Sequence, residues 1–439
     1  MDSYFLDSLV GFIQKSNIRE REYYDDQEFL LHLASTGQAH DTLIQHLPIT
    51  LPNGNVVMLP SDLYFFFETE DLSNASPLFL SQIGLVVTQD GDVTWRDLYA
   101  KNQQIYFVKH QKLSEGEPHR LELQKHFASW EQEFLFPMIA ALDKHDQVRA
   151  WPLWNLKSLI LQFFKVLNSM TFRLGEACER NRNNEDPMLF PIEEMKPDVV
   201  WSTALCAFVM SFGVCLNNEL RRAFDDVFKQ FKKKFNIHSN SAAATGATIF
   251  DLYFDVDRLS WEVIQEKLEY KLKLGYYPKM SALLVPTPNI ALSYFIMEQL
   301  TFYMKHDGEL NKNFRVLGPQ GTSKSVILNT FIHRSQEQFD SIMVPMSGHL
   351  SFDRLREVVE KRYVAKRKKI FTPKNPAKKV VIMIDDLHLQ SNLRINIVEF
   401  MRTWTQSNGY FDVGAGFFKR IADFSVIMAQ NSSYRVDKC

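Results

Sequence analysis

The chain has 439 residues, of which 45% are hydrophobic, 13% aromatic and 23% charged, as in ordinary soluble globular proteins. This composition excludes collagen-like, disordered and low-complexity classes, and the length predicts about two to four domains. Lysine and arginine number 50 against 52 acidic residues, so the net charge of -2 favours neither nucleic acid nor an anionic membrane as a partner.

The cysteines and the N-terminus bear on the compartment. The four cysteines are not spaced as metal ligands, and a chain of this length does not need disulfides to be stable. These features predict a reducing compartment. The first ten residues, MDSYFLDSLV, contain acidic residues and no basic segment, so we expect no secretory signal.

The first half of the chain is predicted to be mainly helical. Residues 1–50 are typical of short helices, whereas 51–88 contain a Pro-Asn-Gly turn and short β-rich runs. Helical periodicity extends from about Val93 to Phe235, and the small polar residues of 236–248 predict a surface loop.

One stretch within this helical region is a candidate membrane span. Residues 199–218 carry no charge over 20 positions, which is long enough to cross a bilayer. Ser202, Thr203 and Ser211 interrupt the stretch, and apolar residues at helical spacing between charges follow it up to Phe235. We therefore predict a buried helix followed by an amphipathic helix, with a membrane span as the less favoured alternative.

From about Ala282 onward, strands alternate with helices. The predicted elements are, in chain order, helix 289–305, strand 313–317, helix 324–336, strand 341–345, helix 351–368, strand 379–384, helix 391–405 and strand 423–429. Because parallel strands are joined by helical crossovers, this alternation predicts an α/β domain with a mainly parallel sheet.

A glycine-rich segment joins the predicted strand 313–317 to the helix that follows. Its residues are Gly318, Pro319, Gln320, Gly321, Thr322, Ser323, Lys324 and Ser325. A strand, a tight turn and a helix N-terminus are the context of a phosphate-binding loop, in which backbone N–H groups surround the phosphates. We expect Lys324 to reach the β- and γ-phosphates and the Ser325 hydroxyl to bind Mg²⁺.

The motif departs from the common pattern at Ser323, because a glycine normally precedes the lysine. If this position requires a positive φ, a residue with a side chain costs on the order of 1 kcal/mol. Such a cost weakens a nucleotide site without abolishing it. The alternative is a glycine-rich turn that precedes a helix by chance.

A second segment supplies acidic residues to the same predicted site. Residues 379–386 read KVVIMIDD, an apolar strand that ends in two carboxylates. We expect Asp385 to contribute to the Mg²⁺ shell. Asp386 is a weak candidate for the base that polarises the attacking water, since its side chain is one methylene shorter than glutamate. The alternative is a strand that ends in a solvated acidic turn.

The segment 361–379 contains nine lysines and arginines and no acid. A nucleic-acid patch is one interpretation of such a run. Tyr363 and Phe371 alone interleave with the charges and are not spaced for stacking on bases. We therefore predict the solvated end of a helix followed by a proline-containing loop.

Several segments resemble, in the same order, the motor region of an axonemal-type dynein heavy chain. The resemblance covers residues 51–429. It rests on FFETEDLSNASPLFLSQIG (66–84), LLVPTPNIALSYFIMEQL (283–300), GPQGTSKS, IDDLHLQ and VEFMRTWTQSNGYFDV (398–413). It implies an AAA+ fold in which residues 1–95 form the C-terminal part of the large subdomain of the second module. Residues 96–280 then form a mainly helical small subdomain and linker, and 281–439 form the truncated P-loop part of the third module.

The resemblance also implies a function and a setting. Its expected cofactors are ATP or ADP with Mg²⁺, and its expected partners are other dynein heavy, intermediate and light chains, with no nucleic acid or membrane. The implied location is the cytoplasm and cytoskeleton, in the axoneme of a cilium. The first module, the stalk and its microtubule-binding tip are not in this sequence, so contact with microtubules is expected only through regions outside it, and a fragmentary or divergent product is expected.

Three departures from the family pattern predict a regulatory or degenerate site. Gln82 replaces the arginine expected to act on the neighbouring module's nucleotide, and an amide cannot supply that positive charge. Residues 388–390 and 430–435 also differ from the family, although Asn431 remains a candidate polar sensor of the γ-phosphate. We therefore expect a dynein-like chain that binds nucleotide and hydrolyses it slowly; the alternative is a scaffold that keeps the fold and no longer uses nucleotide.

Overall fold

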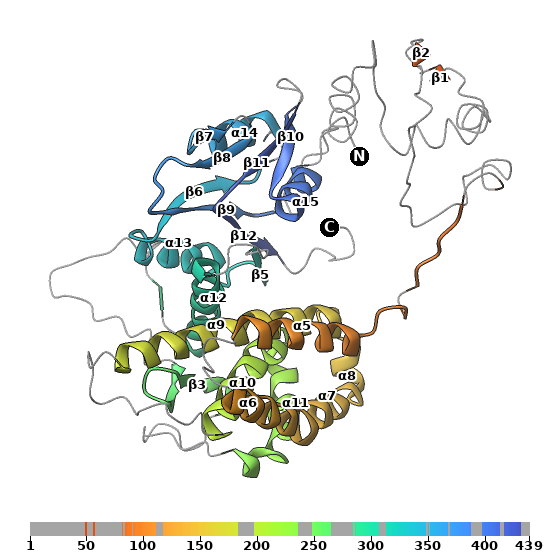
Figure 1. Ribbon diagram of the computed structural model, residues 1–439, viewed down its shortest axis with the longest axis vertical. Coiled ribbons are helices and arrows are strands. Elements are labelled where there is room, and N and C mark those ends of the chain that lie inside the picture. The colour runs from red at the N-terminus through yellow and green to blue at the C-terminus, as the bar shows by residue number, and fades with distance from the viewer. Residues whose placement is uncertain are drawn as a thin grey trace. The chain divides into compact units, whose positions relative to one another are not determined.

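The computed structural model describes most of the chain from Gly91 onward and a few earlier residues. The described residues are 49–50, 56–57, 81, 84–89, 91–110, 117–182, 197–235, 248–264, 284–285, 287–306, 313–347, 350, 352–367, 369–387, 397–412 and 417–431. Contacts divide the chain into two units (Figure 1). We call Met1–Thr88, Asn313–Ser325 and Ile332–Cys439 the α/β unit, and Gln89–Lys312 with Val326–Phe331 the helical unit.

The α/β unit contains strands and helices in alternation, as the sequence predicts. In chain order they are β5 (Phe314–Gly318), α13 (Lys324–Arg334, of which Val326–Phe331 belong to the helical unit), β6 (Phe339–Pro345), α14 (Phe352–Glu360), β7 (Tyr363–Arg367), β8 (Ile370–Pro373), β9 (Lys379–Asp385), α15 (Ile397–Ser407), β10 (Gly409–Asp412), β11 (Phe417–Ile421) and β12 (Phe424–Asn431). Nearer the N-terminus, β1 (Ile49–Thr50) pairs antiparallel with β2 (Val56–Val57).

The main sheet has four strands in the order β5-β12-β9-β6, and all its neighbours are parallel. This confirms the predicted parallel α/β fold and the four strands read from the sequence. The central strand β9 is buried from Val380 to Ile384, as its uninterrupted apolar run indicates. In such a sheet the carboxyl ends of all strands lie at one edge, where ligands of open α/β sheets bind.

A second sheet, in the order β10-β11-β8-β7, was not predicted. The predicted helix 351–368 is wrong beyond Glu360, where α14 ends, and an antiparallel hairpin of β7 and β8 follows instead. The loop predicted in 361–379 is confined to 374–378, between β8 and β9. The physical reason is that Tyr363 is buried in the core, while the lysines around it lie on the solvated side and obscure the strand pattern.

Both sheets share one apolar core. Its buried members are Ile342, Val344, Met346, Leu355, Val359, Tyr363, Val380, Ile382, Ile384, Leu387, Phe400, Met401, Trp404, Tyr410, Ile421 and Val426. Trp404 lies at its centre, with ring centroids 5.2 Å from Phe400, 6.0 Å from Tyr410 and 5.4 Å from Phe424. The side chains that hold the second sheet therefore also pack against the strands of the main sheet.

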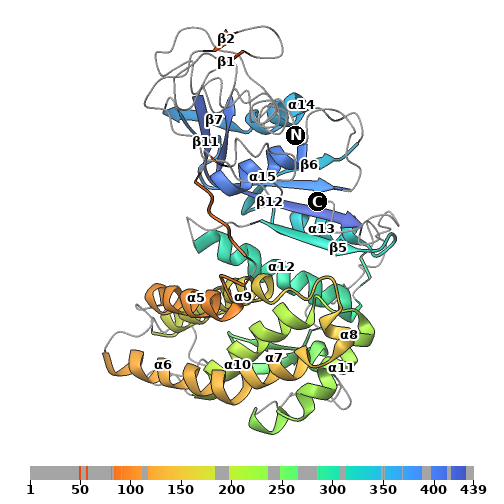
Figure 2. The ribbon, with the colours of Figure 1, turned by 90° about the vertical axis from the view of Figure 1, so that its right-hand side faces the viewer.

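The helical unit is formed mainly by helices, visible in the lower part of Figure 2. Its elements are α5 (Trp95–Lys109), α6 (Glu117–Trp130), η2 (Glu131–Leu135), α7 (Phe136–Asp143), α8 (Asp146–Arg149), α9 (Leu156–Arg182), α10 (Pro197–Phe208), η3 (Val209–Gly213), α11 (Asn218–Lys229), η4 (Lys232–Lys234), η6 (Ile249–Asp251), β3 (Leu252–Asp255), β4 (Ser260–Val263) and α12 (Pro288–His306). The mainly helical character predicted for 93–235 is confirmed.

The uncharged stretch 199–218 is a core element of this unit. It forms α10 and then a π-helical turn, η3, whose five residues are all buried. The polar residue Thr203 donates a hydrogen bond to the carbonyl of Val199 at 2.7 Å, which satisfies its hydroxyl within the helix. The amphipathic helix α11 follows, and among the described residues no helix is both long and apolar enough to traverse a bilayer.

Aromatic side chains dominate the packing of the helical unit. The rings of Trp130 and Phe163 stack with centroids 5.8 Å apart, and Phe134 meets Phe208 edge-on at 5.5 Å. Gly213 is required at the end of η3, because a Cβ there would lie 2.3 Å from the ring of Phe250. Close packing of this kind fixes the helix positions more tightly than helix propensity does.

A carboxylate is buried among these rings. Glu131 is only 8% exposed, and its Oε1 accepts a hydrogen bond from the Tyr99 hydroxyl at 2.7 Å and another from the Gln103 amide. Burial raises the pKa of Glu131, and the hydrogen bond from Tyr99 opposes that rise only in part. The charged form is therefore less favourable in the folded chain than in the unfolded one.

We expect Glu131→Gln to raise the free energy of unfolding at neutral pH and to make that free energy less dependent on pH. Because the pKa of Glu131 is raised on folding, stability falls as the pH rises from the unfolded pKa through the folded one. Glutamine keeps the acceptor oxygen and carries no charge to desolvate. Urea unfolding between about pH 4 and pH 7 measures the difference. The control is Glu219→Gln, at an exposed position of α11; an equal pH response of both variants and wild type would contradict the account.

Candidate functional site

The glycine-rich segment connects β5 to α13, as predicted. Strand β5 ends at Gly318 and α13 begins at Lys324, so five residues form the loop between them. The first amides of a helix have no partner within the helix and carry partial positive charge. The loop and the helix start therefore provide the backbone N–H groups that an anion-binding site requires.

Two residues of the loop adopt left-handed backbone angles. Gly321 has φ 77° and Ser323 has φ 61°. Glycine adopts such angles without steric cost, whereas the side chain of serine costs about 1–2 kcal/mol. The condition stated for Ser323 from the sequence is thus met: this position has a positive φ and carries a strained residue.

The Lys324 side chain folds back over the loop. Its ammonium donates hydrogen bonds to the carbonyl oxygens of Gly318 at 3.0 Å and Pro319 at 2.7 Å. An ammonium group has three N–H donors, so this geometry leaves one donor for an oxygen of a ligand. The two carbonyls fix the position of the charge at the start of α13.

A threonine hydroxyl closes the same loop. Thr322 Oγ1 donates a hydrogen bond to the carbonyl of Pro319 at 2.8 Å, so one carbonyl accepts from both Thr322 and Lys324. Sequence reasoning placed Thr322 in the loop but missed this bond, because no pattern of residue types encodes it.

The parallel sheet brings the other predicted site residues to the same edge. Asn431, the last residue of β12, pairs in register with Gly318, and Asp385 is the last residue of β9, the other neighbour of β12. Asn431 is buried, Asp385 is half-buried and Asp386 is exposed. The sheet thus places Asp385, Asn431 and the loop at its carboxyl edge.

The two acidic residues differ in conformation. Asp386 has φ 57°, a left-handed angle that aspartate tolerates better than most residues, and its N–H donates to Asp385 Oδ1 at 3.0 Å. This bond orients one carboxylate oxygen of Asp385. Leu387 then donates to the carbonyl of Ala429 at 2.9 Å and fixes the chain after the two acids.

The residues present fit a nucleotide with Mg²⁺. Within the described parts of the chain, no cluster of three or more His, Cys, Asp or Glu side chains exists that holds a metal by itself. Mg²⁺ in nucleotide sites needs fewer protein ligands, commonly one or two together with phosphate oxygens and water. Ser325 and Asp385 match that smaller requirement.

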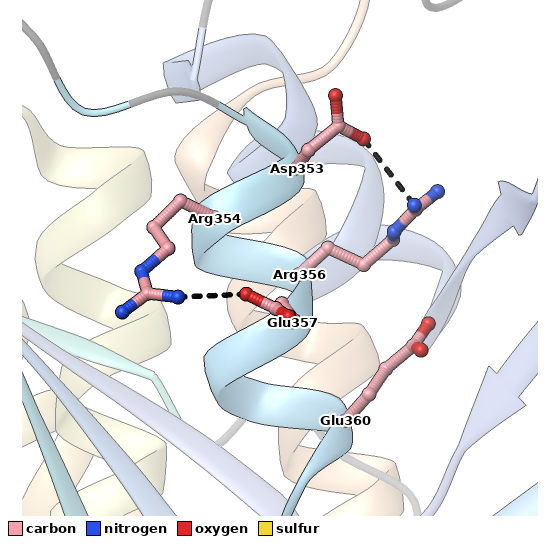
Figure 3. A pocket seen from close by; sticks show the side chains of 5 residues that line it. All are labelled: Asp353, Arg354, Arg356, Glu357 and Glu360. Carbon is pink, nitrogen blue, oxygen red and sulfur yellow. Dashed lines mark hydrogen bonds and ion pairs between the residues drawn. The ribbon is translucent and has the colours of Figure 1, made fainter.

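A surface hollow elsewhere in the α/β unit is unrelated to this loop. It measures about 430 Å³ and is lined from α14 by Asp353, Arg354, Arg356, Glu357 and Glu360 (Figure 3). Arg354 pairs with Glu357 at 2.8 Å, and Arg356 pairs with Asp353 at 3.3 Å. The third carboxylate, Glu360, pairs with Lys419 of β11 at 2.8 Å, so each charged side chain of the lining has an ion-pair partner.

Some predicted features lie outside the described residues. These are the short helices predicted for 1–50 up to residue 48, Gln82, residues 236–247 of the predicted surface loop, and the segments 388–390 and 432–435. A further residue that sequence reasoning missed is Asn313, whose Oδ1 accepts from the N–H of Val426 at 2.7 Å. This bond ties the start of β5 to the central strand β12 and thereby helps to set the register of the loop.

Comparison with known families gives two matches that follow one another along the chain. Residues 153–265 match the family described as the dynein heavy chain AAA lid domain. Residues 272–435 match the P-loop containing dynein motor region. The second range contains the loop, Asp385 and Asn431, and the first contains α9, α10 and α11.

Individual relatives cover most of the chain. It is 25% identical over 392 residues to human dynein axonemal heavy chain 6, which covers 87% of this chain and 8% of the relative. It is 23% identical to human dynein axonemal heavy chain 3, with 83% and 9% covered. It is 19% identical to the dynein-1-beta heavy chain of the flagellar inner arm I1 complex of Chlamydomonas reinhardtii, with 88% and 9% covered.

The chain thus spans less than a tenth of the length of these relatives. The matched families, the relatives and the parallel sheet with its P-loop agree with one another and with the resemblance read from the sequence. The chain belongs to the dynein heavy chain family and corresponds to a part of its motor region with the α/β fold of an AAA+ module.

Proposed function

We propose that the chain binds ATP or ADP with Mg²⁺ at Gly318–Ser325 and acts as a regulatory AAA+ module in dynein-based movement along microtubules. The observation that carries this proposal is the position of Lys324. Its ammonium lies over the loop on the carbonyls of Gly318 and Pro319, at the N-terminus of α13. A fixed positive charge beside unpartnered helix amides is suited to a di- or triphosphate.

The proposed roles follow from the chemistry of each group. The remaining N–H of Lys324 and the backbone N–H groups of Gly318 and of 320–325 bind phosphate oxygens, whereas Pro319 has no N–H to donate. The Ser325 hydroxyl would be a direct ligand of Mg²⁺, and Asp385 would accept hydrogen bonds from the water shell of the ion, which when bound would neutralise phosphate charge. We further propose that the amide of Asn431, which pairs with Gly318 on the neighbouring strand, contacts the γ-phosphate.

Hydrolysis by the chain alone is proposed to be slow. The short Asp386 carboxylate is the candidate base, and its residue is exposed with a left-handed backbone. An arginine finger is an arginine side chain that stabilises the negative charge of a transferring phosphoryl group, and it raises kcat about 10³–10⁵-fold. In this family the arginine comes from a neighbouring module. Loss of the arginine therefore lowers the hydrolysis rate by more than Asp386 can restore as a base.

The proposed setting follows from the relatives. These relatives are axonemal and flagellar dyneins. We infer that this chain acts in the cytoskeleton of a cilium together with other dynein heavy, intermediate and light chains. We also infer that 1–95 belong to the second AAA+ module, 96–280 to its small subdomain and linker, and 281–439 to the third.

We expect Lys324→Ala to weaken binding of Mg·ATP and Mg·ADP about 10–100-fold, because a charged hydrogen bond is worth about 1.5–3 kcal/mol. Calorimetric titration of the full chain measures the loss. The matched control is Lys366→Ala, an exposed lysine on β7, which should bind as the wild type does. If the wild-type chain takes up no nucleotide and both variants behave alike, the scaffold alternative replaces this proposal.

We expect Asp386→Asn to leave nucleotide affinity unchanged and to change turnover by less than about twofold, since the finger rather than the base limits the rate. Asp385→Asn is the companion variant, which should weaken the Mg²⁺-dependent part of binding. Phosphate release under saturating ATP measures turnover. A wild-type rate near 1 s⁻¹ or above, within the range of about 1–10³ s⁻¹ usual for enzymes, would refute slow hydrolysis.

A further inference from the structure

The Thr322 hydroxyl makes a bond that the phosphate-binding roles of the loop do not use. It spans three residues backward to the carbonyl of Pro319 at 2.8 Å, and the same carbonyl accepts from Lys324 at 2.7 Å. Because the bond joins the two ends of the loop, it opposes any opening of the turn between Pro319 and Thr322. It also keeps the Pro319 carbonyl where the lysine needs it.

The residue at the other side of the turn leaves room for this hydroxyl. A Cβ built on Gly318 would lie 2.8 Å from Thr322 Oγ1, closer than Cβ atoms lie to non-bonded heavy atoms in proteins. Gly318 is therefore needed at the end of β5 for the threonine to reach its partner. A β-carbon at position 318 would displace the hydroxyl from the turn.

The bond lies next to the strained residue of the loop. Ser323, adjacent to Thr322, has φ 61°, whereas a residue with a side chain favours negative φ by on the order of tenfold in equilibrium constant. Relaxation of Ser323 would rotate the peptide between Thr322 and Ser323 and move the Thr322 side chain. A neutral hydrogen bond at an exposed site shifts a conformational equilibrium constant about two- to fivefold. The Thr322 bond therefore offsets a substantial part of the preference of Ser323 for negative φ.

We propose that Thr322 is a positioning residue, whose hydroxyl bond to Pro319 holds the loop in its nucleotide-binding shape against the strain at Ser323. The inference rests on the proposed function, because it concerns the same loop. In P-loops with the common pattern, a glycine before the lysine adopts the positive φ without steric cost; here the Thr322 bond compensates for the cost at Ser323. The bond thereby raises the fraction of molecules whose loop has the nucleotide-binding conformation, and the apparent affinity is proportional to that fraction.

The first test measures the loop without nucleotide. Amide hydrogen exchange of residues 320–325 is followed in the full chain for wild type, Thr322→Val and Thr322→Ser. Valine keeps the branched shape and lacks the hydroxyl, whereas serine keeps the hydroxyl. We expect Thr322→Val to exchange about two- to fivefold faster than wild type and Thr322→Ser to match wild type. Equal exchange in all three overturns the proposal, whether or not the chain binds nucleotide.

The second test is a double-mutant cycle on Mg·ADP affinity. Thr322→Val should raise Kd about two- to fivefold with Ser323 present, and less than about twofold in the Ser323→Gly background, where the strain is gone. If Thr322→Val raises Kd equally with serine and with glycine at position 323, the hydroxyl bond does not compensate for the strain at Ser323 and the proposal is overturned. Failure of wild type to bind Mg·ADP overturns the proposed function instead, and the exchange experiment then still decides whether the hydroxyl holds the loop.

Discussion

The parallel pairing of β12 with both β5 and β9 is the constraint on which the site depends. Asn431 pairs with Gly318, and Met428 pairs with Ile384, one residue before Asp385. This register delivers the loop, the first acidic residue and the polar end of β12 to one edge of the sheet. A shift by one residue would point β12 side chains to the opposite face and remove Asn431 from this edge.

Backbone strain in the α/β unit gathers at the edges of these strands. Ser323 and Asp386 have positive φ at the site, and Asn408 and Asp423 have φ 52° where β10 begins and β11 meets β12. Asparagine and aspartate adopt this region at low cost, whereas serine has no such preference. The strain at Ser323 is therefore the one that needs compensation, and it is located in the loop that carries the proposed function.

The sequence was sufficient for the main sheet and for the order of the site residues along it. Uninterrupted apolar runs such as 380–384 identify buried parallel strands, and Lys324 and Asp385 follow from strand ends. The second sheet was missed because Tyr363 is the one buried side chain described in β7, and a short segment with one buried residue among lysines resembles a solvated helix end. The Thr322 bond depends on backbone angles at Gly321 and Ser323, which residue types alone do not specify.

The most direct test of nucleotide binding at the loop is site-resolved amide exchange of the full chain with and without Mg·ADP at about 1 mM, the upper end of usual enzyme affinities. The account predicts slower exchange with Mg·ADP at Gly318 and 320–325, because their N–H groups would bond to phosphate oxygens. The hairpin of β7 and β8 serves as an internal reference and should not change. If exchange at the loop is the same with and without Mg·ADP while the hairpin keeps its protection, the account is contradicted.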